Sequence, residues 1–289
     1  MSLIQLVVNN PEKKWFWLGI SRHPSITLDT VRQYPKLPWD WFGLSENTSI
    51  TMAVILEHPK LPWAWWAISK SINVTMADID SHPELPWNYV GVSWNPNLTM
   101  DYVLQHPEKG WFWGGLSANR AFTMTDIDSH PKLPWDWNWM SGNPSITIAD
   151  VDRHPDKNWN WTSLSMNPSV TMADVLRHPA EWDWRCLSAN RGITMTDVLR
   201  YPKLPWVGSG LSLNPNVTLE DVRRNPEIEW KWEYFSRNPN VTMAIIEANP
   251  KLPWSWRGFS SNPNLTPRNV REHPKEDWRW SSFYEMSRL

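Results

Sequence analysis

Apolar and polar positions recur along the chain with a period of 24 residues. The clearest marker is a threonine that follows a branched or aromatic apolar residue. These threonines are Thr27, Thr51, Thr75, Thr99, Thr123, Thr147, Thr171, Thr194, Thr218, Thr242 and Thr266. Successive markers lie 24 residues apart, except that Thr171 and Thr194 lie 23 apart. With the segment 3–26, they predict a single repeat domain over 1–289, with units starting near residues 3, 27, 51, 75, 99, 123, 147, 171, 194, 218, 242 and 266.

The first half of each unit has the pattern of a short helix. In TMADVLRHP at 171–179, Thr171 suits the N-cap and Asp174 suits a capping box. Apolar residues one and four positions after the threonine share one helix face, and the following proline disfavours helix at the residue before it. We expect about two turns of helix, from one to seven residues after each threonine. The equivalent acids are Asp78, Asp126, Asp150, Asp197 and Asp221.

The second half opens with a phrase such as HPKLPWDW at 130–137. Its second proline suits the first position of a helix, where a missing N–H costs nothing. An Asn-Pro turn signal ends the segment. We therefore expect a second helix from the Pro-Trp pair to the serine before the turn. The predicted fold class is all-α, a solenoid of about twelve helical hairpins with two short helices per unit.

Tryptophan explains how such short helices gain stability. One tryptophan is present in all twelve units, from Trp15 to Trp278, and a second follows two residues later in ten, with Tyr89 and Gly208 as the exceptions. A buried tryptophan removes roughly 200 Å² from water, worth roughly 5 kcal/mol before entropy is counted. We expect these residues to form the core. Because Gly208 and Gly210 disfavour helix, we also expect a bend or a loosened contact near 179–213.

Bulk composition narrows the classes of function. The chain of 289 residues has 25 Trp, 26 Pro and only 11 Gly, with a formal charge of −2. This balance does not favour nucleic acid or an anionic membrane as a partner. The single cysteine, Cys186, excludes an intrachain disulfide framework and fits a reducing compartment. Neither a signal peptide nor an apolar run of membrane-spanning length is recognisable, so we expect a protein that is not secreted and has no membrane partner.

The repeated motif, Asn-Pro-Asn-[Ile/Val/Leu]-Thr followed by [His/Asn]-Pro-x-Leu-Pro-Trp-x-Trp-x-x-[Leu/Phe]-Ser, resembles a known type of sequence. It is similar to the tryptophan-rich helical repeats of uncharacterised proteins from large double-stranded DNA viruses of the mimivirus and marseillevirus kind. The resemblance covers essentially the whole chain. It implies a viral source, a location in the host cytoplasm or in the virion, and no known catalytic activity. It supplies no functional residues.

Candidate chemical groups favour structural roles. Seven histidines precede proline at one repeat position, which Tyr34, Tyr201, Asn225 and Asn249 occupy in other units. This variation suits a polar side chain that closes the C-terminus of a helix better than a series of metal-binding histidines. Metal ligands must converge within about 2.1 Å of one ion. Cys186 occupies a small-residue position and suits a buried structural thiol better than a nucleophile. Because phosphate loops and hydrolase motifs are also absent from the sequence, we expect no enzyme, no cofactor and no metal.

Two sets of residues are candidates for partner binding. Arg153, Arg177, Arg200 and Arg224 occupy one position in four successive units, where they suit a phosphate backbone, an acidic partner or simply a solvated face balanced by nearby Asp residues. Trp66, Trp94 and Trp139 lie outside the two regular tryptophan positions, where they suit an interaction hot spot or the filling of gaps between units. The predicted function is a non-enzymatic scaffold or virion component that binds a protein partner. The alternative is a modular nucleic-acid-binding repeat array.

Overall fold

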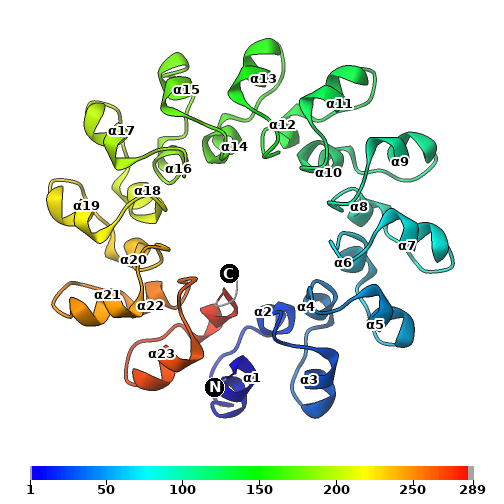
Figure 1. Cartoon of the computed structure of the whole chain (residues 1–289), viewed down its shortest axis with the longest axis horizontal. Coiled ribbons are helices and arrows are strands. Elements are labelled where there is room, and N and C mark those ends of the chain that lie inside the picture. Colours follow the sequence, from blue (N-terminus) through cyan, green and yellow to red (C-terminus); the bar gives the residue numbers. More distant parts are fainter. Residues whose placement is uncertain (1, 286–289) are drawn as a thin grey trace. The chain divides into compact units, whose positions relative to one another are not determined.

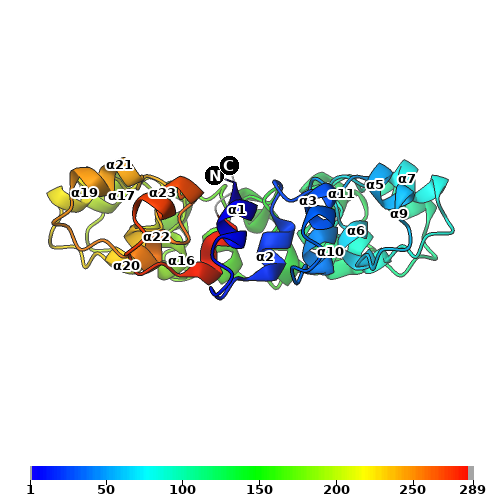
Figure 2. The same cartoon turned by 90° about the horizontal axis from the view of Figure 1, so that it is seen from below.

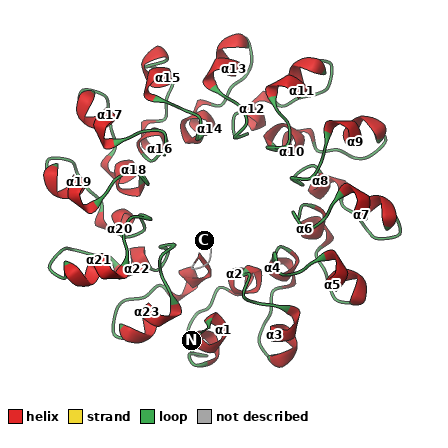
Figure 3. Ribbon diagram, in the orientation of Figure 1, coloured by secondary structure: helices red, strands yellow, loops and turns green. Residues whose placement is uncertain are grey.

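The computed structural model describes residues 2–285, and every regular element in that range is helical (Figure 3). The predicted all-α fold with two short helices per unit is thus confirmed. The first helices of successive units are α1 (Leu3–Val8), α3 (Leu28–Gln33), α5 (Met52–Glu57), α7 (Met76–Ser81), α9 (Met100–Gln105), α11 (Met124–Ser129), α13 (Ile148–Arg153), α15 (Met172–Arg177), α17 (Met195–Arg200), α19 (Leu219–Arg224), α21 (Met243–Ala248) and α23 (Pro267–Glu272).

The second helices alternate with the first along the chain. They are α2 (Trp17–Arg22), α4 (Trp41–Ser45), α6 (Trp65–Ser69), α8 (Tyr89–Val92), α10 (Trp113–Ala118), α12 (Trp137–Met140), α14 (Trp161–Met166), α16 (Trp184–Ser188), α18 (Gly208–Leu213), α20 (Trp232–Phe235) and α22 (Trp256–Phe259). A 3₁₀ helix, η1 (Trp280–Glu285), takes the same place in the last repeat.

The chain divides into two compact units, each described here by itself. Unit 1 consists of Met1–Ile20 with Val170–Leu289, and unit 2 is Ser21–Ser169. Within each unit the first helices form one row and the second helices form another (Figure 1). The view turned by 90° separates the same rows, with α5 and α7 of unit 2 at a different level from α6 (Figure 2). Each repeat therefore presents one face built by its first helix and another built by its second.

The first helices begin as the sequence predicts. Thr75 Oγ1 accepts a hydrogen bond from the N–H of Asp78, whose carboxylate in turn accepts one from the N–H of Thr75. The same capping box is present for all six predicted threonine–aspartate pairs. The helices end one residue earlier than expected, since the residue before proline, such as His82 with φ −130° and ψ 57°, has left the helical region.

The second helices correct the prediction that they begin at the Pro-Trp pair. They begin two residues later, at the second aromatic position, and the residue between the two aromatics is the N-cap. A side-chain cap supports this start in some repeats, as where the Asp136 carboxylate accepts a hydrogen bond from the N–H of Trp139 at 3.1 Å. The helices α6, α10, α18 and α20 begin at the same position without such a cap. The proline instead belongs to a tight turn in which the N–H of Trp135 bonds to Leu133 O at 2.8 Å.

The two regular aromatics join consecutive repeats. The indole N–H of the first tryptophan is fixed to a carbonyl five residues earlier, as in Trp87 to His82 O at 2.8 Å. Its ring meets the second aromatic of the preceding repeat edge to face, as in Trp65 and Trp87 with centroids 5.3 Å apart. The same T-shaped pair recurs at Trp41–Trp63, Tyr89–Trp111, Trp113–Trp135, Trp137–Trp159, Trp184–Trp206, Trp232–Trp254 and Trp256–Trp278. The predicted core role is confirmed for Trp63, Trp135, Trp182 and Trp278, which are buried, whereas the other regular tryptophans are partly exposed.

Buried polar side chains form a second link between repeats. Ser141 Oγ donates to Trp137 O at 2.9 Å in its own helix and accepts from the N–H of Asn160 in the next repeat at 2.8 Å. Asn143 Nδ2 lies within 3.1 Å of three carbonyl oxygens of the preceding repeat. Equivalent asparagines that donate to carbonyls of the preceding repeat are Asn47, Asn95, Asn119, Asn167, Asn214, Asn238 and Asn262.

The region expected to be loosened keeps these links. The N–H of Val207 bonds to Ser188 Oγ at 3.0 Å, and Asn214 Nδ2 reaches three carbonyls of the preceding repeat. At Gly210 a Cβ atom would lie only 2.4 Å from Arg185 O, so α18 approaches α16 more closely than any other residue type would allow. The glycines therefore tighten the backbone contact here, in place of the loosened contact that helix propensity suggested.

The first repeat packs against the last repeat inside unit 1. Trp15 meets Trp280 edge to face, with centroids 5.2 Å apart and an angle of 85°. Lys13 Nζ lies 5.2 Å from the centroid of the Trp280 ring, as Lys157 Nζ lies 5.5 Å from that of Trp137 between neighbouring repeats of unit 2. The contact between the two ends of the chain thus reproduces the contact that joins each repeat to the next.

Candidate partner-binding surface

The second-helix face of unit 2 carries a set of additional aromatic side chains. They belong to α4, α6, α8, α10 and α12 or to the residues bordering these helices, which follow one another along one row (Figure 1). None of them occupies a regular tryptophan position. We call this set the aromatic surface, and its members are Phe42, Trp66, Trp94, Phe112 and Trp139.

Three of these rings form one cluster. Trp94 and Trp139 meet at 74° with centroids 5.6 Å apart, and Phe112 contacts both, at 6.1 and 5.9 Å. Glycines make room for them, because a Cβ atom at Gly115 would lie 2.9 Å from Trp94 Nε1 and one at Gly114 would lie 2.9 Å from Trp139 Cδ1. Two of the three predicted tryptophans are therefore brought together.

Trp66 packs elsewhere on the same face. Its ring stacks on Phe42 at an angle of 14°, with centroids 5.7 Å apart, and Lys70 Nζ lies 4.2 Å from its centroid. Lys70 is held in turn by Glu46, whose carboxylate also pairs with Arg22 and whose side chain is only 7% exposed. An ion network across three repeats thus fixes the cation that covers Trp66.

The aromatic surface is only partly covered by the protein itself. Phe42 is 38% exposed and Trp139 is 44% exposed, and Val90, between the two ring groups in sequence, is 43% exposed. Exposed aromatic rings in fixed positions lose little conformational freedom on binding and are enriched among interface hot spots. Gap filling accounts for the contacts that Trp94 and Trp139 share, but it leaves this exposed apolar area without a structural role.

Sequence reasoning identified the tryptophans of this surface but missed Phe42 and Phe112. Both occupy positions whose side chains differ from repeat to repeat, and Phe112 stands where other repeats have an Asp or Asn cap. The sequence differences at these two positions could have identified both phenylalanines as members of the aromatic surface. Phe112 is an aromatic residue at a position that provides a side-chain cap in six repeats, and Trp139 stands at a position usually occupied by a small residue.

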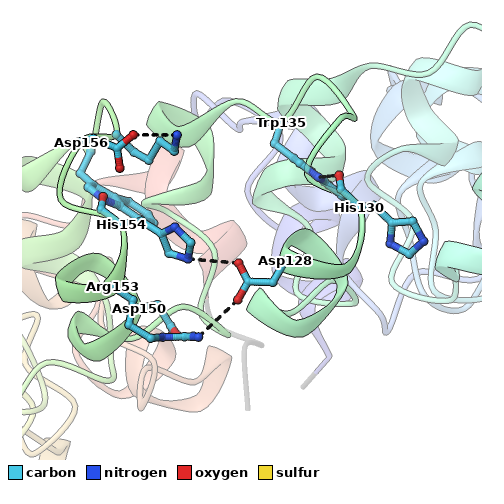
Figure 4. Close-up of polar contacts among 9 residues, drawn as sticks. Asp128, His130, Trp135, Asp150, Arg153, His154 and Asp156 are labelled. Atoms are coloured by element: carbon cyan, nitrogen blue, oxygen red, sulfur yellow. Dashed lines mark hydrogen bonds and ion pairs between the residues drawn. The ribbon is translucent and has the colours of Figure 1, made fainter.

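The first of the predicted arginines joins two neighbouring repeats. Arg153 lies 3.3 Å from Asp128 of α11 and 2.5 Å from Asp150 of its own helix α13, and His154 Nε2 lies 3.1 Å from the other oxygen of Asp128 (Figure 4). Burial of Asp150 opposes its ionisation, but hydrogen bonds from Thr147 and Arg153 outweigh this and lower its pKa. Arg153, whose side chain is 57% exposed, therefore bridges two repeats at the surface.

The other three arginines are engaged by nearby residues of unit 1. Arg177 lies 3.6 Å from Asp174, and Arg224 lies 2.8 Å from Glu220, one turn earlier on the same helix. Arg200 lies over the neighbouring Tyr201 ring, 5.6 Å from its centroid. These contacts correspond to a solvated face of mixed charge, which was one of the interpretations of the arginine pattern.

The side chain at the histidine position closes the first helix, as predicted, at His130, Asn225 and Asn249, whereas His58, His82, His154 and His273 contact charged side chains. His130 Nδ1 lies 2.9 Å from Asp126 O, and Asn225 and Asn249 at the same position donate to the equivalent carbonyls at 2.8 Å. The backbone carbonyl of the residue at this position accepts a hydrogen bond from the indole N–H of the first tryptophan, as in Trp135 to His130 O at 3.0 Å (Figure 4). Across residues 2–285 no group of three or more His, Cys, Asp or Glu side chains is placed to hold a metal ion.

Two candidate features remain, the single cysteine and a helix that could span a membrane. Cys186 is half-buried, and burial and the nearby Asp183 raise its pKa, which disfavours the reactive thiolate. In the described part of the chain, no helix combines the length and the apolar character needed to cross a membrane.

Comparison with known proteins gives no assignment. No family model, curated protein or solved structure matches the chain.

Proposed function

We propose that this protein is a non-enzymatic repeat scaffold that binds a protein partner through the aromatic surface of unit 2. The single observation that carries the proposal is the set of five fixed rings, two of them more than one-third exposed, on consecutive second helices. The resemblance of the repeat motif to proteins of large DNA viruses supports a viral origin. It also supports a role in the host cytoplasm or in the virion.

Capture of partners under matched conditions tests this proposal. We expect the wild-type chain to retain a protein that the triple variant Trp66→Ala/Trp94→Ala/Trp139→Ala loses. The control variant, Leu56→Ala/Leu104→Ala, removes exposed apolar side chains from the first helices of the same unit and should retain it. Quantitative mass spectrometry of the captured proteins gives the comparison. A partner lost equally from both variants, or from neither, would contradict the assigned surface.

The alternative function, a nucleic-acid-binding array, makes a different prediction. Reversing Arg153, Arg177, Arg200 and Arg224 to Glu should leave binding of RNA and DNA undetectable before and after the change, since nearby acids or rings already engage these side chains. Fluorescence anisotropy with labelled single strands measures this. Submicromolar binding by the wild type that is lost in the variant and weakens with salt, at a log–log slope of about −0.7 per phosphate contact, would favour the alternative.

A further inference from the structure

Repeat 194–217 lacks the second aromatic side chain. Gly208 stands where ten repeats have Trp and one has Tyr. On either side of it, within unit 1, the T-shaped pairs Trp184–Trp206 and Trp232–Trp254 are complete. Trp230, the first tryptophan of the next repeat, has no ring partner among residues 2–285. The repeat is therefore missing one indole from an otherwise continuous series.

A hollow borders Gly208, the residue that lacks the side chain. Its volume is about 450 Å³, within the range of small-molecule sites, and its apolar lining consists mainly of Leu199, Pro202, Trp206, Val207, Leu211 and Ile228. Where Tyr89 replaces the larger indole, a smaller hollow of about 340 Å³ lies at the corresponding place in unit 2. We call the hollow at Gly208 the glycine slot.

Backbone of the next repeat occupies only the root of the missing side chain. A Cβ atom on Gly208 would lie 2.2 Å from Glu229 O, so the next repeat has closed over the root of the absent side chain. Beyond this root the hollow remains, with Leu199 at its border 52% exposed. A group that fills the slot must therefore come from outside the chain.

The charge around the slot differs from that around three of the occupied aromatic positions, which a lysine covers; six other repeats have Leu at the lysine position. Lys109 Nζ lies 5.0 Å from the centroid of Tyr89, and Lys13 and Lys157 cover Trp280 and Trp137 in the same way. At the glycine slot the residue equivalent to these lysines is Ile228. It is flanked by Glu227 and Glu229, both of which line the hollow. Glu229 accepts a hydrogen bond from Lys231, whereas Glu227 is exposed and has no ion pair within the described part of the chain.

We infer that the glycine slot binds a small flat aromatic molecule that carries a protonated amine, of the arylalkylamine class. The ring packs against Trp206, Leu211 and Ile228, next to the position that lacks an aromatic side chain. The ammonium group is attracted to Glu227, the carboxylate that lacks a cation. The slot lies in unit 1 and is separate from the aromatic surface, so this inference does not rest on the proposed function.

Titration with three indole compounds tests the inference on the intact chain. The probes are tryptamine, neutral indole and indole-3-propionate, which share a ring and differ in charge. The readout is the methyl NMR signals of Leu199, Leu211 and Ile228, with Leu164 of unit 2 as an internal reference. We expect tryptamine to shift the three slot signals and to bind about tenfold more tightly than indole-3-propionate, because the carboxylates attract one charge and repel the other. The Leu164 signal should not move.

Two surface variants separate the ring contact from the charge contact. Glu227→Gln should weaken tryptamine binding severalfold and leave indole binding unchanged. Ile228→Lys introduces the cation that three other repeats have at this position and should weaken tryptamine binding further. No shift at the slot methyls up to about 10 mM tryptamine, equal affinities for tryptamine and indole-3-propionate, or an unchanged affinity in Glu227→Gln would each overturn the inference.

Discussion

Replacing Asn143 by leucine is expected to lower the free energy of unfolding by about 4 kcal/mol, although the two side chains are similar in size. Asn143 is fully buried, and its amide donates to Ser117 O, Asn119 O and Phe122 O. Each buried carbonyl left without a donor costs about 1–3 kcal/mol. Asn119 O keeps the N–H of Phe122 as a donor, so this cost falls on Ser117 O and Phe122 O, both of one neighbouring repeat. The lost stability should therefore come from weaker contact between the repeat that contains Asn143 and the preceding repeat.

Urea denaturation followed by far-ultraviolet circular dichroism measures this loss. The matched control is Asn97→Leu, because Asn97 Nδ2 also donates to two carbonyls of the preceding repeat, Ile72 O and Val74 O, but at a more exposed site. Water can replace these bonds, so the control should cost about 1 kcal/mol or less. Equal losses for the two variants would show that the buried asparagines do not hold the repeats together.

The second large effect is expected for Trp111→Ala, at about 3–5 kcal/mol. The Trp111 indole N–H donates to His106 O at 2.9 Å, and the ring packs edge to face on Tyr89 with centroids 5.4 Å apart. Alanine removes both contacts and leaves a cavity between two short helices, which have little other apolar surface to bury.

Trp139→Ala provides the comparison for Trp111→Ala. Trp139 is 44% exposed, and its ring packs on Trp94 and Phe112, outside the regular tryptophan pairs. We expect thermal and urea unfolding to show a loss at Trp139 well below that at Trp111. If the two losses were equal, the distinction between the tryptophans that join repeats and those of the aromatic surface would fail.

Much of the fold could be predicted because its local rules repeat. The threonine–aspartate capping boxes and the two-helix unit depend on residues within three or four positions of each other, so one repeat contains the whole signal. The start of the second helix was misplaced because proline favours the first turn of a helix as well as a tight turn. A carboxylate or amide at the N-cap, as in Asp40 and Asn88, favours the later start, but Ala64 and Val207 are N-caps at the same position without a side-chain cap bond.

The links between repeats were harder to predict. Ser141 and Asn143 resemble ordinary helix-end and turn residues, and only the neighbouring repeat shows that their partners lie 19–26 residues away. The aromatic surface was predicted in part, since the tryptophans departed from the regular pattern while Phe42 and Phe112 were missed. The arginine pattern was visible in sequence, but the partners that engage Arg153, such as Asp128 of the preceding repeat, depend on the packing of the helices.

The most direct test of the proposed binding function is isothermal titration calorimetry with the purified captured partner. We expect Trp66→Ala/Trp94→Ala/Trp139→Ala to weaken binding by about 100-fold or more, as the loss of hot-spot tryptophans does at protein interfaces. Circular dichroism should show that the variant remains helical, and Leu56→Ala/Leu104→Ala should bind like the wild type. A partner that binds the folded aromatic variant with unchanged affinity would contradict the assignment of the aromatic surface.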